Sequence, residues 1–61
     1  MTNRVEIPAY TDRWMMGDRY GVVTLQGKLR NAKGELADIV RVKLDKSGKE
    51  VRVWLDDCRE V

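Results

Sequence analysis

Strict alternation of apolar and polar residues marks two segments in the second half of the chain. They are residues 40–45, Val-Arg-Val-Lys-Leu-Asp, and residues 51–56, Val-Arg-Val-Trp-Leu-Asp. A period of two with many β-branched residues is typical of β-strands that bury one face. The two segments therefore predict a β-hairpin, with its turn near Ser47 and Gly48.

The length of that turn decides which residues face each other. A three-residue loop would send the two apolar faces to opposite sides, whereas a two-residue turn at Ser47-Gly48 brings them together. We therefore predict the two-residue turn, with Gly48 in the positive-φ conformation that it requires. The predicted inward pairs are Val40 with Leu55, Val42 with Val53 and Leu44 with Val51, and the outward pairs are Arg41 with Trp54, Lys43 with Arg52 and Asp45 with Glu50.

A longer hairpin is predicted just before this one, from arms at residues 20–30 and 35–45. Residues 31–34, Asn-Ala-Lys-Gly, connect the arms, and we expect a four-residue loop with Gly34 in the left-handed conformation. This loop puts Gly27 opposite Asp38 on the inner face, which predicts a bulge or kink near Gly27. The other expected inward pairs are Leu29 with Leu36, Leu25 with Val40, and Val23 with Val42.

The two ends of the chain predict less regular structure. Residues 1–19 are expected to form an irregular segment with room for a short strand at 4–7, and residues 58–61 suit a second edge strand after a break at 56–57. Residues 11–17 fit two interpretations. A helical turn capped by Thr11 or Asp12 would end at Gly17, but the stretch could equally be extended.

These elements predict an all-β fold made of one domain, residues 1–61. A three-stranded meander with short terminal strands buries one face only if it curls, so we expect a small five-stranded barrel. Residues 17–23, Gly-Asp-Arg-Tyr-Gly-Val-Val, and the hairpin at 40–55 resemble the SH3-like barrels, which include the KOW and Tudor-type modules. KOW modules have a denser glycine pattern before the valine strand. The resemblance therefore implies the fold and not ribosome or transcript binding.

Composition argues against catalysis. The chain has 61 residues, no histidine and one cysteine, and it is 43% hydrophobic. Histidine is the usual proton carrier at neutral pH and the commonest metal ligand. A chain this short needs nearly all its apolar residues for the core. The carboxylates Asp56 and Asp57 are neighbours, and neighbours in a strand point to opposite faces. We expect no enzyme activity, catalytic residue, metal, cofactor or small-molecule substrate.

The same composition bears on location and partners. No run of 18 apolar residues occurs, so we expect no contact with a membrane and a soluble protein. The first eight residues hold no apolar stretch of signal-peptide length, and a single cysteine, Cys58, excludes an internal disulfide. Both suit the cytoplasm. A formal net charge of +2 permits an anionic partner without requiring one.

One aromatic residue carries the main functional hypothesis. Alternation puts Trp54 on the outward face of the hairpin with the cations Arg41, Lys43 and Arg52. An indole between cations is suited to stack a nucleobase while the cations hold phosphates. The sequence therefore predicts a nucleic-acid or other anionic-partner site at these four residues. The plainer interpretation is that the N-terminal segment covers Trp54, or that it makes a cation–π contact with Arg41.

A protein partner or a homo-oligomer is the alternative. A domain this small exposes sheet edges, and Val22 and Ile39 are expected on the outer face, where association would cover them. An accessory domain encoded by a phage or mobile element would fit this description. Trp14, Met15 and Met16 are also residues of the kind found at interfaces, although we favour their packing into an open barrel end.

Overall fold

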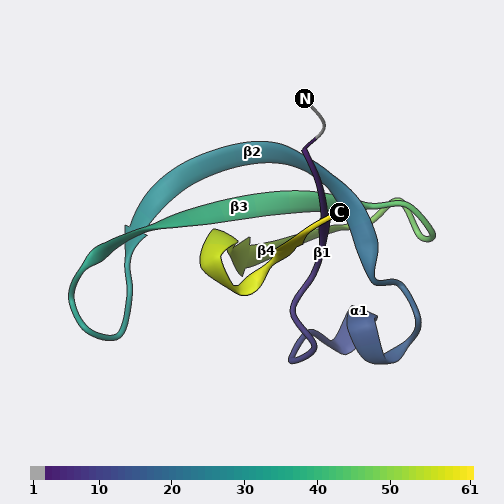
Figure 1. Ribbon diagram of the computed structural model, residues 1–61, viewed down its shortest axis with the longest axis horizontal. Coiled ribbons are helices and arrows are strands. Elements are labelled where there is room, and N and C mark those ends of the chain that lie inside the picture. Colours follow the sequence, from purple (N-terminus) through teal and green to yellow (C-terminus); the bar gives the residue numbers. More distant parts are fainter. Residues whose placement is uncertain (1–2) are drawn as a thin grey trace.

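The computed structural model describes residues 3–61, so the first two residues of the segment predicted at 1–19 lie outside the described residues. Most of the described chain is β-structure (Figure 1). The elements in chain order are β1 (Arg4–Glu6), helix α1 (Asp12–Met15), β2 (Tyr20–Arg30), β3 (Leu36–Leu44), β4 (Glu50–Trp54), the 3-10 turn η1 (Leu55–Asp57) and β5 (Arg59–Glu60).

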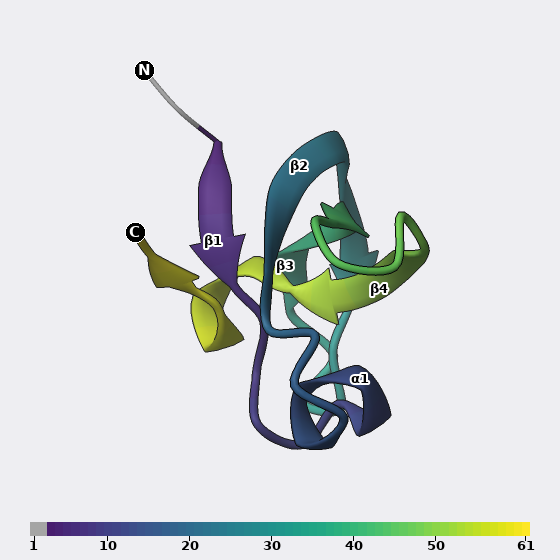
Figure 2. The ribbon, with the colours of Figure 1, turned by 90° about the vertical axis from the view of Figure 1, so that its right-hand side faces the viewer.

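The five strands found in residues 3–61 belong to one antiparallel sheet with the order β4-β3-β2-β1-β5, which confirms the all-β class. The sheet is curved, and β2 arches across β3 (Figures 1 and 2). The predicted closure into a barrel is wrong. Closure would require β4 to pair with β5, but β5 has two residues and pairs with β1 alone. Its few backbone groups cannot bridge the two edges, so the sheet stays open.

The core lies on one face of β3. Val40, Val42 and Leu44 are each at most 1% exposed, which confirms that the even-numbered residues of this strand point inward. Val53 of β4 and Val5 and Ile7 from the N-terminal segment complete the fully buried cluster. Partly buried side chains surround that cluster; they are Trp14, Val23, Val51, Leu55 and Cys58.

The hairpin of β3 and β4 has a different register from the predicted one. Val40 lies opposite Val53 and Val42 opposite Val51, so every predicted pair is displaced by two residues. A shift of two leaves each side chain on its predicted face, because the side-chain period of a strand is two. The inward and outward sets were therefore predicted correctly, and the individual partners were not.

The connecting loop explains this shift. It is a four-residue loop, 45–48, closed by two backbone hydrogen bonds. The Leu44 N–H donates to the Lys49 carbonyl oxygen, and the Gly48 N–H donates to the Leu44 carbonyl oxygen. Gly48 has a φ of +74°, as expected. Asp45 does not pair with β4. Its N–H donates to the Tyr20 carbonyl oxygen, and its carboxylate forms an ion pair of 2.6 Å with Arg4. The predicted two-residue turn would instead set the Asp45 and Glu50 carboxylates side by side, which is unfavourable.

The pairing of β2 with β3 changes register along its length. Val23 lies opposite Val42, as predicted, but a bulge between Val23 and Leu25 shifts the strand by one residue beyond it. Leu25 then faces Arg41, and Gly27 faces Ile39. The predicted pairs of Leu25 with Val40 and of Leu29 with Leu36, and the bulge expected at Gly27 opposite Asp38, are therefore wrong.

The loop that connects β2 and β3 is the physical reason for this change of register. It has three residues, 32–34, because the Asn31 N–H donates to the Glu35 carbonyl oxygen. The Asn31 side-chain oxygen accepts from the N–H groups of Lys33 and Glu35, and Gly34 takes the expected left-handed φ of +79°. A three-residue loop shifts the pairing by one residue from the predicted four-residue loop. The bulge restores the inward orientation of Val23.

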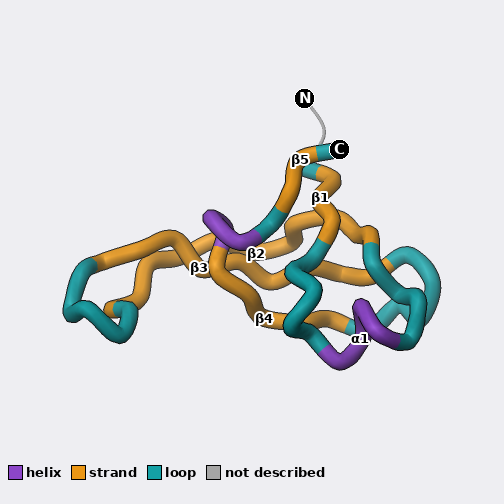
Figure 3. Tube along the Cα trace, turned by 60° about the horizontal axis from the view of Figure 1, so that its bottom comes forward, coloured by secondary structure: helices purple, strands orange, loops and turns teal. Residues whose placement is uncertain are grey.

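The far half of this hairpin stands away from the rest of the sheet (Figures 1 and 3). We call residues 25–39, with their loop, the arm. Beyond Ile39 of β3 the arm has no third strand among the described residues, since β4 pairs with β3 only from Ile39 onward. Three leucines predicted for the core are exposed here: Leu25 by 60%, Leu29 by 45% and Leu36 by 61%.

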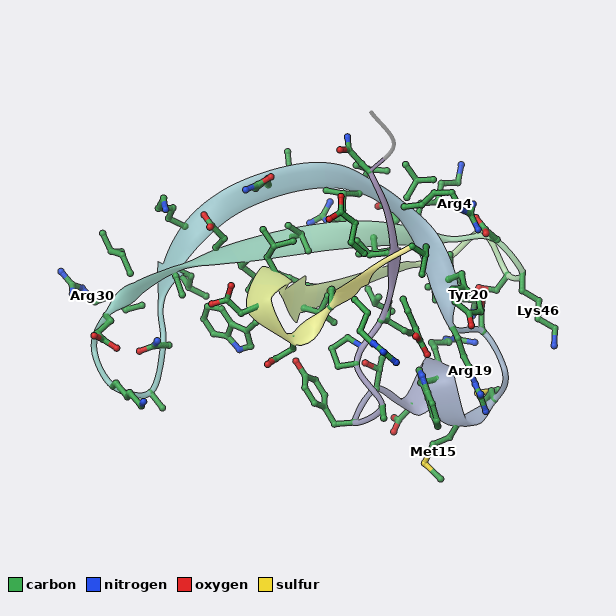
Figure 4. The ribbon with its side chains drawn as sticks, in the orientation of Figure 1. Arg4, Met15, Arg19, Tyr20, Arg30 and Lys46 are labelled. Carbon is green, nitrogen blue, oxygen red and sulfur yellow. The ribbon has the colours of Figure 1, made fainter. Side chains whose placement is uncertain are left out.

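Residues 11–17 contain the single helical turn that was one of the two interpretations. Gly17 ends it with a φ of +86°. Trp14 packs against the core and donates its indole N–H to Glu6, and Arg19 stacks on its ring at 3.8 Å. Met15 and Met16 do not pack as we favoured. They are 79% and 67% exposed, and Met15 points away from α1 (Figure 4).

Two glycines of β2, Gly21 and Gly27, differ in how closely other atoms approach them, and substitution by alanine tests this difference. An added Cβ at Gly21 would overlap the Lys43 carbonyl oxygen and lie 2.8 Å from the Val42 Cγ1 atom. At Gly27 it would meet no atom of residues 3–61 within 4 Å. Gly21→Ala should lower the free energy of unfolding by about 1–3 kcal/mol. Gly27→Ala, the matched control, should raise it by up to about 1 kcal/mol, because alanine restricts the unfolded chain. Urea unfolding measures both, and equal effects would contradict the close contact at Gly21.

Candidate anion-binding face

The four residues predicted as a partner site share one face of the sheet. We define the outer face as the side of β2, β3 and β4 opposite the core. The register places Arg41 and Lys43 of β3, and Arg52 and Trp54 of β4, on this face. The three cations are exposed and Trp54 is half-buried. The structure thus brings the four residues onto one surface, although their arrangement differs from the predicted one.

Arg41 lies directly opposite Arg52. The prediction put Trp54 opposite Arg41, and the two-residue shift of the hairpin corrects this. Like charges that face each other across two strands repel. Arg52 has no ion pair with a carboxylate of residues 3–61. An anion placed between the two guanidinium groups would relieve the repulsion and accept hydrogen bonds from both.

One carboxylate offsets part of this charge. Glu50 lies opposite Lys43, and its Oε1 atom is 3.9 Å from the Arg41 Nη1 atom. Its Oε2 atom accepts a hydrogen bond of 3.0 Å from the Thr24 hydroxyl, which holds the carboxylate in place. Three cations against one carboxylate leave this part of the outer face with a net charge of +2. The face therefore remains attractive to anions.

A groove runs beside the two arginines. It has a volume of about 260 Å³, and its lining on the outer face consists of Leu25, Gly27, Ile39, Arg41 and Arg52. Gly27 forms an open part of the lining, since it has no side chain and no atom of residues 3–61 lies near its Cβ position. The sequence analysis missed this groove. It assigned Leu25 and Gly27 to the inner face, and the bulge between Val23 and Leu25 turned both of them outward.

Trp54 lies at the border of the basic patch and not at its centre. Its partner across the strands is Ile39. It lines a second hollow of about 460 Å³ between the arm and η1, together with Ala37, Asp56 and Asp57. Those carboxylates repel phosphate. Among residues 3–61 the cation–π contact is the one between Arg19 and Trp14, so the contact expected between Arg41 and Trp54 does not form.

Cys58 lies on the other side of the sheet. It lines a hollow of about 360 Å³ with Val5, Val23 and Leu55. Burial raises the pKa of the Cys58 thiol above its ordinary value of 9.0, and the Asp57 carboxylate adds to this effect. Less thiolate is then present at neutral pH, whereas a reactive cysteine requires a lowered pKa.

The described residues contain no group of three or more metal-ligating side chains that could hold an ion. Likewise, no helix within residues 3–61 has the length and apolar character needed to span a bilayer.

Comparison with known proteins identifies no relative: no protein family, curated protein or solved structure matches this chain. The resemblance to the SH3-like barrels therefore stays a prediction.

The raised pKa of Cys58 predicts slow alkylation. At pH 8 the folded protein should react with iodoacetamide more slowly than the chain in urea, and its rate should still rise above pH 9 as thiolate forms. Asp57→Asn should speed the reaction, because it removes the negative charge beside the thiol. Mass spectrometry follows the modification. A rate that levels off below pH 8 would contradict the raised pKa.

Proposed function

We propose that this chain is a small, non-enzymatic binding module that holds nucleic acid on its outer face, through Arg41, Lys43 and Arg52 with Trp54 at the border. The main support for this proposal is that Arg41 of β3 lies directly opposite Arg52 of β4. Two cations set against each other without full compensation favour a polyanion, whose phosphates recur along the strand.

The rest of the face supports this assignment. Lys43 extends the row of cations along β3, and the groove beside the arginines offers apolar surface next to positive charge. Nucleic acid presents these two properties together, as phosphates and as the faces of its bases. A site in the cytoplasm, where such a ligand is accessible, belongs to this proposal.

The binding should be weak and dependent on salt. Contacts to two or three phosphates predict a dissociation constant of about 10⁻⁴–10⁻⁶ M and a slope of about −1.4 to −2 in a plot of log K against log salt for a single strand. Arg52→Glu should weaken binding at least about tenfold, since it removes one contact and adds repulsion. Fluorescence anisotropy of labelled oligonucleotides measures this.

Two further variants make the test specific. Arg59→Glu is the matched control, because Arg59 lies on β5 with 83% of its side chain exposed, far from β4 in the strand order, and the change in net charge is the same. It should change the affinity by less than about threefold. Glu50→Gln should strengthen binding, because it releases Arg41. Equal losses for Arg52→Glu and Arg59→Glu, or no binding near 100 μM protein, would overturn the proposal.

A second candidate function is self-association through the arm. Leu29 lies on the outer face of the arm and Leu36 on its inner face, so the arm presents exposed leucine on both sides. Two-stranded hairpins are marginally stable in water by themselves. A second copy packed against the arm would bury these leucines and cover its open strand edges. An unrelated protein partner would do the same, and the test below separates the two.

Sedimentation velocity tests self-association. Between about 10 μM and about 1 mM protein, the sedimentation coefficient should rise for the natural chain and stay at the monomer value for a variant with Leu29→Gln and Leu36→Gln. Met15→Gln is the control, since Met15 is also a large apolar side chain, 79% exposed, but lies on α1. A natural chain that stays monomeric over this range would contradict self-association and leave a foreign partner as the remaining occupant of the arm.

A further inference from the structure

We propose that the groove beside Arg41 and Arg52 receives an unpaired nucleobase, so that the nucleic acid held by this face is single-stranded. This inference rests on the proposed function and specifies its ligand. The observation behind it is the placement of apolar side chains and an open glycine on the same face as the two arginines.

Part of the groove lining belongs to the arm and is apolar. Leu25 and Ile39 line it from β2 and β3, and Gly27, directly opposite Ile39, leaves the space between them open. Leu25 is 60% exposed, although it belongs to a chain with few large apolar residues to spare. A flat apolar ring laid over Gly27 would contact both side chains and remove them from water.

The positive charge beside the groove favours a flat ring that carries an anionic group. Arg41 and Arg52 lie in the same row across the strands as Leu25, next to the row of Gly27 and Ile39, and their guanidinium groups can bind a phosphate or stack on a base. A base carries its own phosphate a short distance away, so one nucleotide satisfies both parts of the groove. A neutral apolar peptide would leave the two arginines facing each other without an anion. An acidic peptide would satisfy them without using the flat apolar surface.

The size of the groove favours one base over a base pair. Its volume, about 260 Å³, lies below the range of about 300–1,000 Å³ that is common for pockets of drug-sized ligands. In a duplex the faces of the bases are stacked on each other, and only their edges and the phosphates are accessible. A duplex would therefore contact the arginines and leave the groove empty. A single strand can turn one base out and use both.

Gly27→Val tests the inference without threatening the fold. Valine favours extended strands, and an added Cβ meets no atom of residues 3–61 within 4 Å at this position. The variant should melt at or above the temperature of the natural chain, which shows that it is folded. Ala37→Val is the control: it creates the same valine side chain on the same face of the arm, and Ala37 lines the other hollow and not the groove.

Anisotropy titrations would use a single strand of about 15 nucleotides, its duplex, and an abasic strand with the same number of phosphates. We expect the natural chain to bind the single strand at least about fivefold more tightly than the abasic strand. Gly27→Val should remove that difference and leave duplex binding within about twofold. Ala37→Val should bind all three ligands like the natural chain.

The outcomes separate this inference from the proposed function. If the single strand, the abasic strand and the duplex bind with equal affinity, and Gly27→Val changes none of these affinities, the groove takes no base. The outer face then binds nucleic acid through its phosphates alone. Tighter binding of the duplex, with the arm as a two-stranded ribbon in the major groove, would also overturn the inference. If none of the three ligands binds the natural chain, the proposed function fails as well.

Discussion

Burial of one face of β3 is the constraint on which the rest of this structure depends. Val40, Val42 and Leu44 are the most completely buried residues of the central part of the sheet, and each one points to the same side. Because a strand alternates its side chains, this burial sends Arg41 and Lys43 to the opposite side. The positive outer face is therefore a direct consequence of how the core is built.

The bulge in β2 connects the core to the candidate site. Inward burial of Val23 requires one register with β3, and the three-residue loop at the far end of the hairpin requires another. The bulge accommodates both, and beyond it each side chain of β2 changes face. Leu25 and Gly27 consequently stand beside Arg41 on the outer face, where they line the groove. Without the bulge that region would carry Gln26 and Lys28.

The same change of register produces the exposed arm. Leu25, Leu29 and Leu36 would contribute to a core in the simpler pairing, and they are exposed in the observed one. A chain of 61 residues has little apolar surface to leave in water. Both proposed interactions make use of this surface, since a base in the groove would cover Leu25 and a second copy would cover Leu29 and Leu36. The two can therefore coexist on one molecule.

The sequence by itself determined the strand segments, the face of each side chain in β3 and β4, and the positive φ of Gly34 and Gly48, because these follow from local alternation and from the turns between the strands. It left residues 11–17 between a helical turn and an extended stretch. Only the tertiary structure decided the pairing. Loop length depends on contacts such as that of Asp45 with Arg4, which join distant parts of the chain. A loop shift of two residues preserved the predicted face at β4, whereas a shift of one reversed it for the β2 residues of the arm.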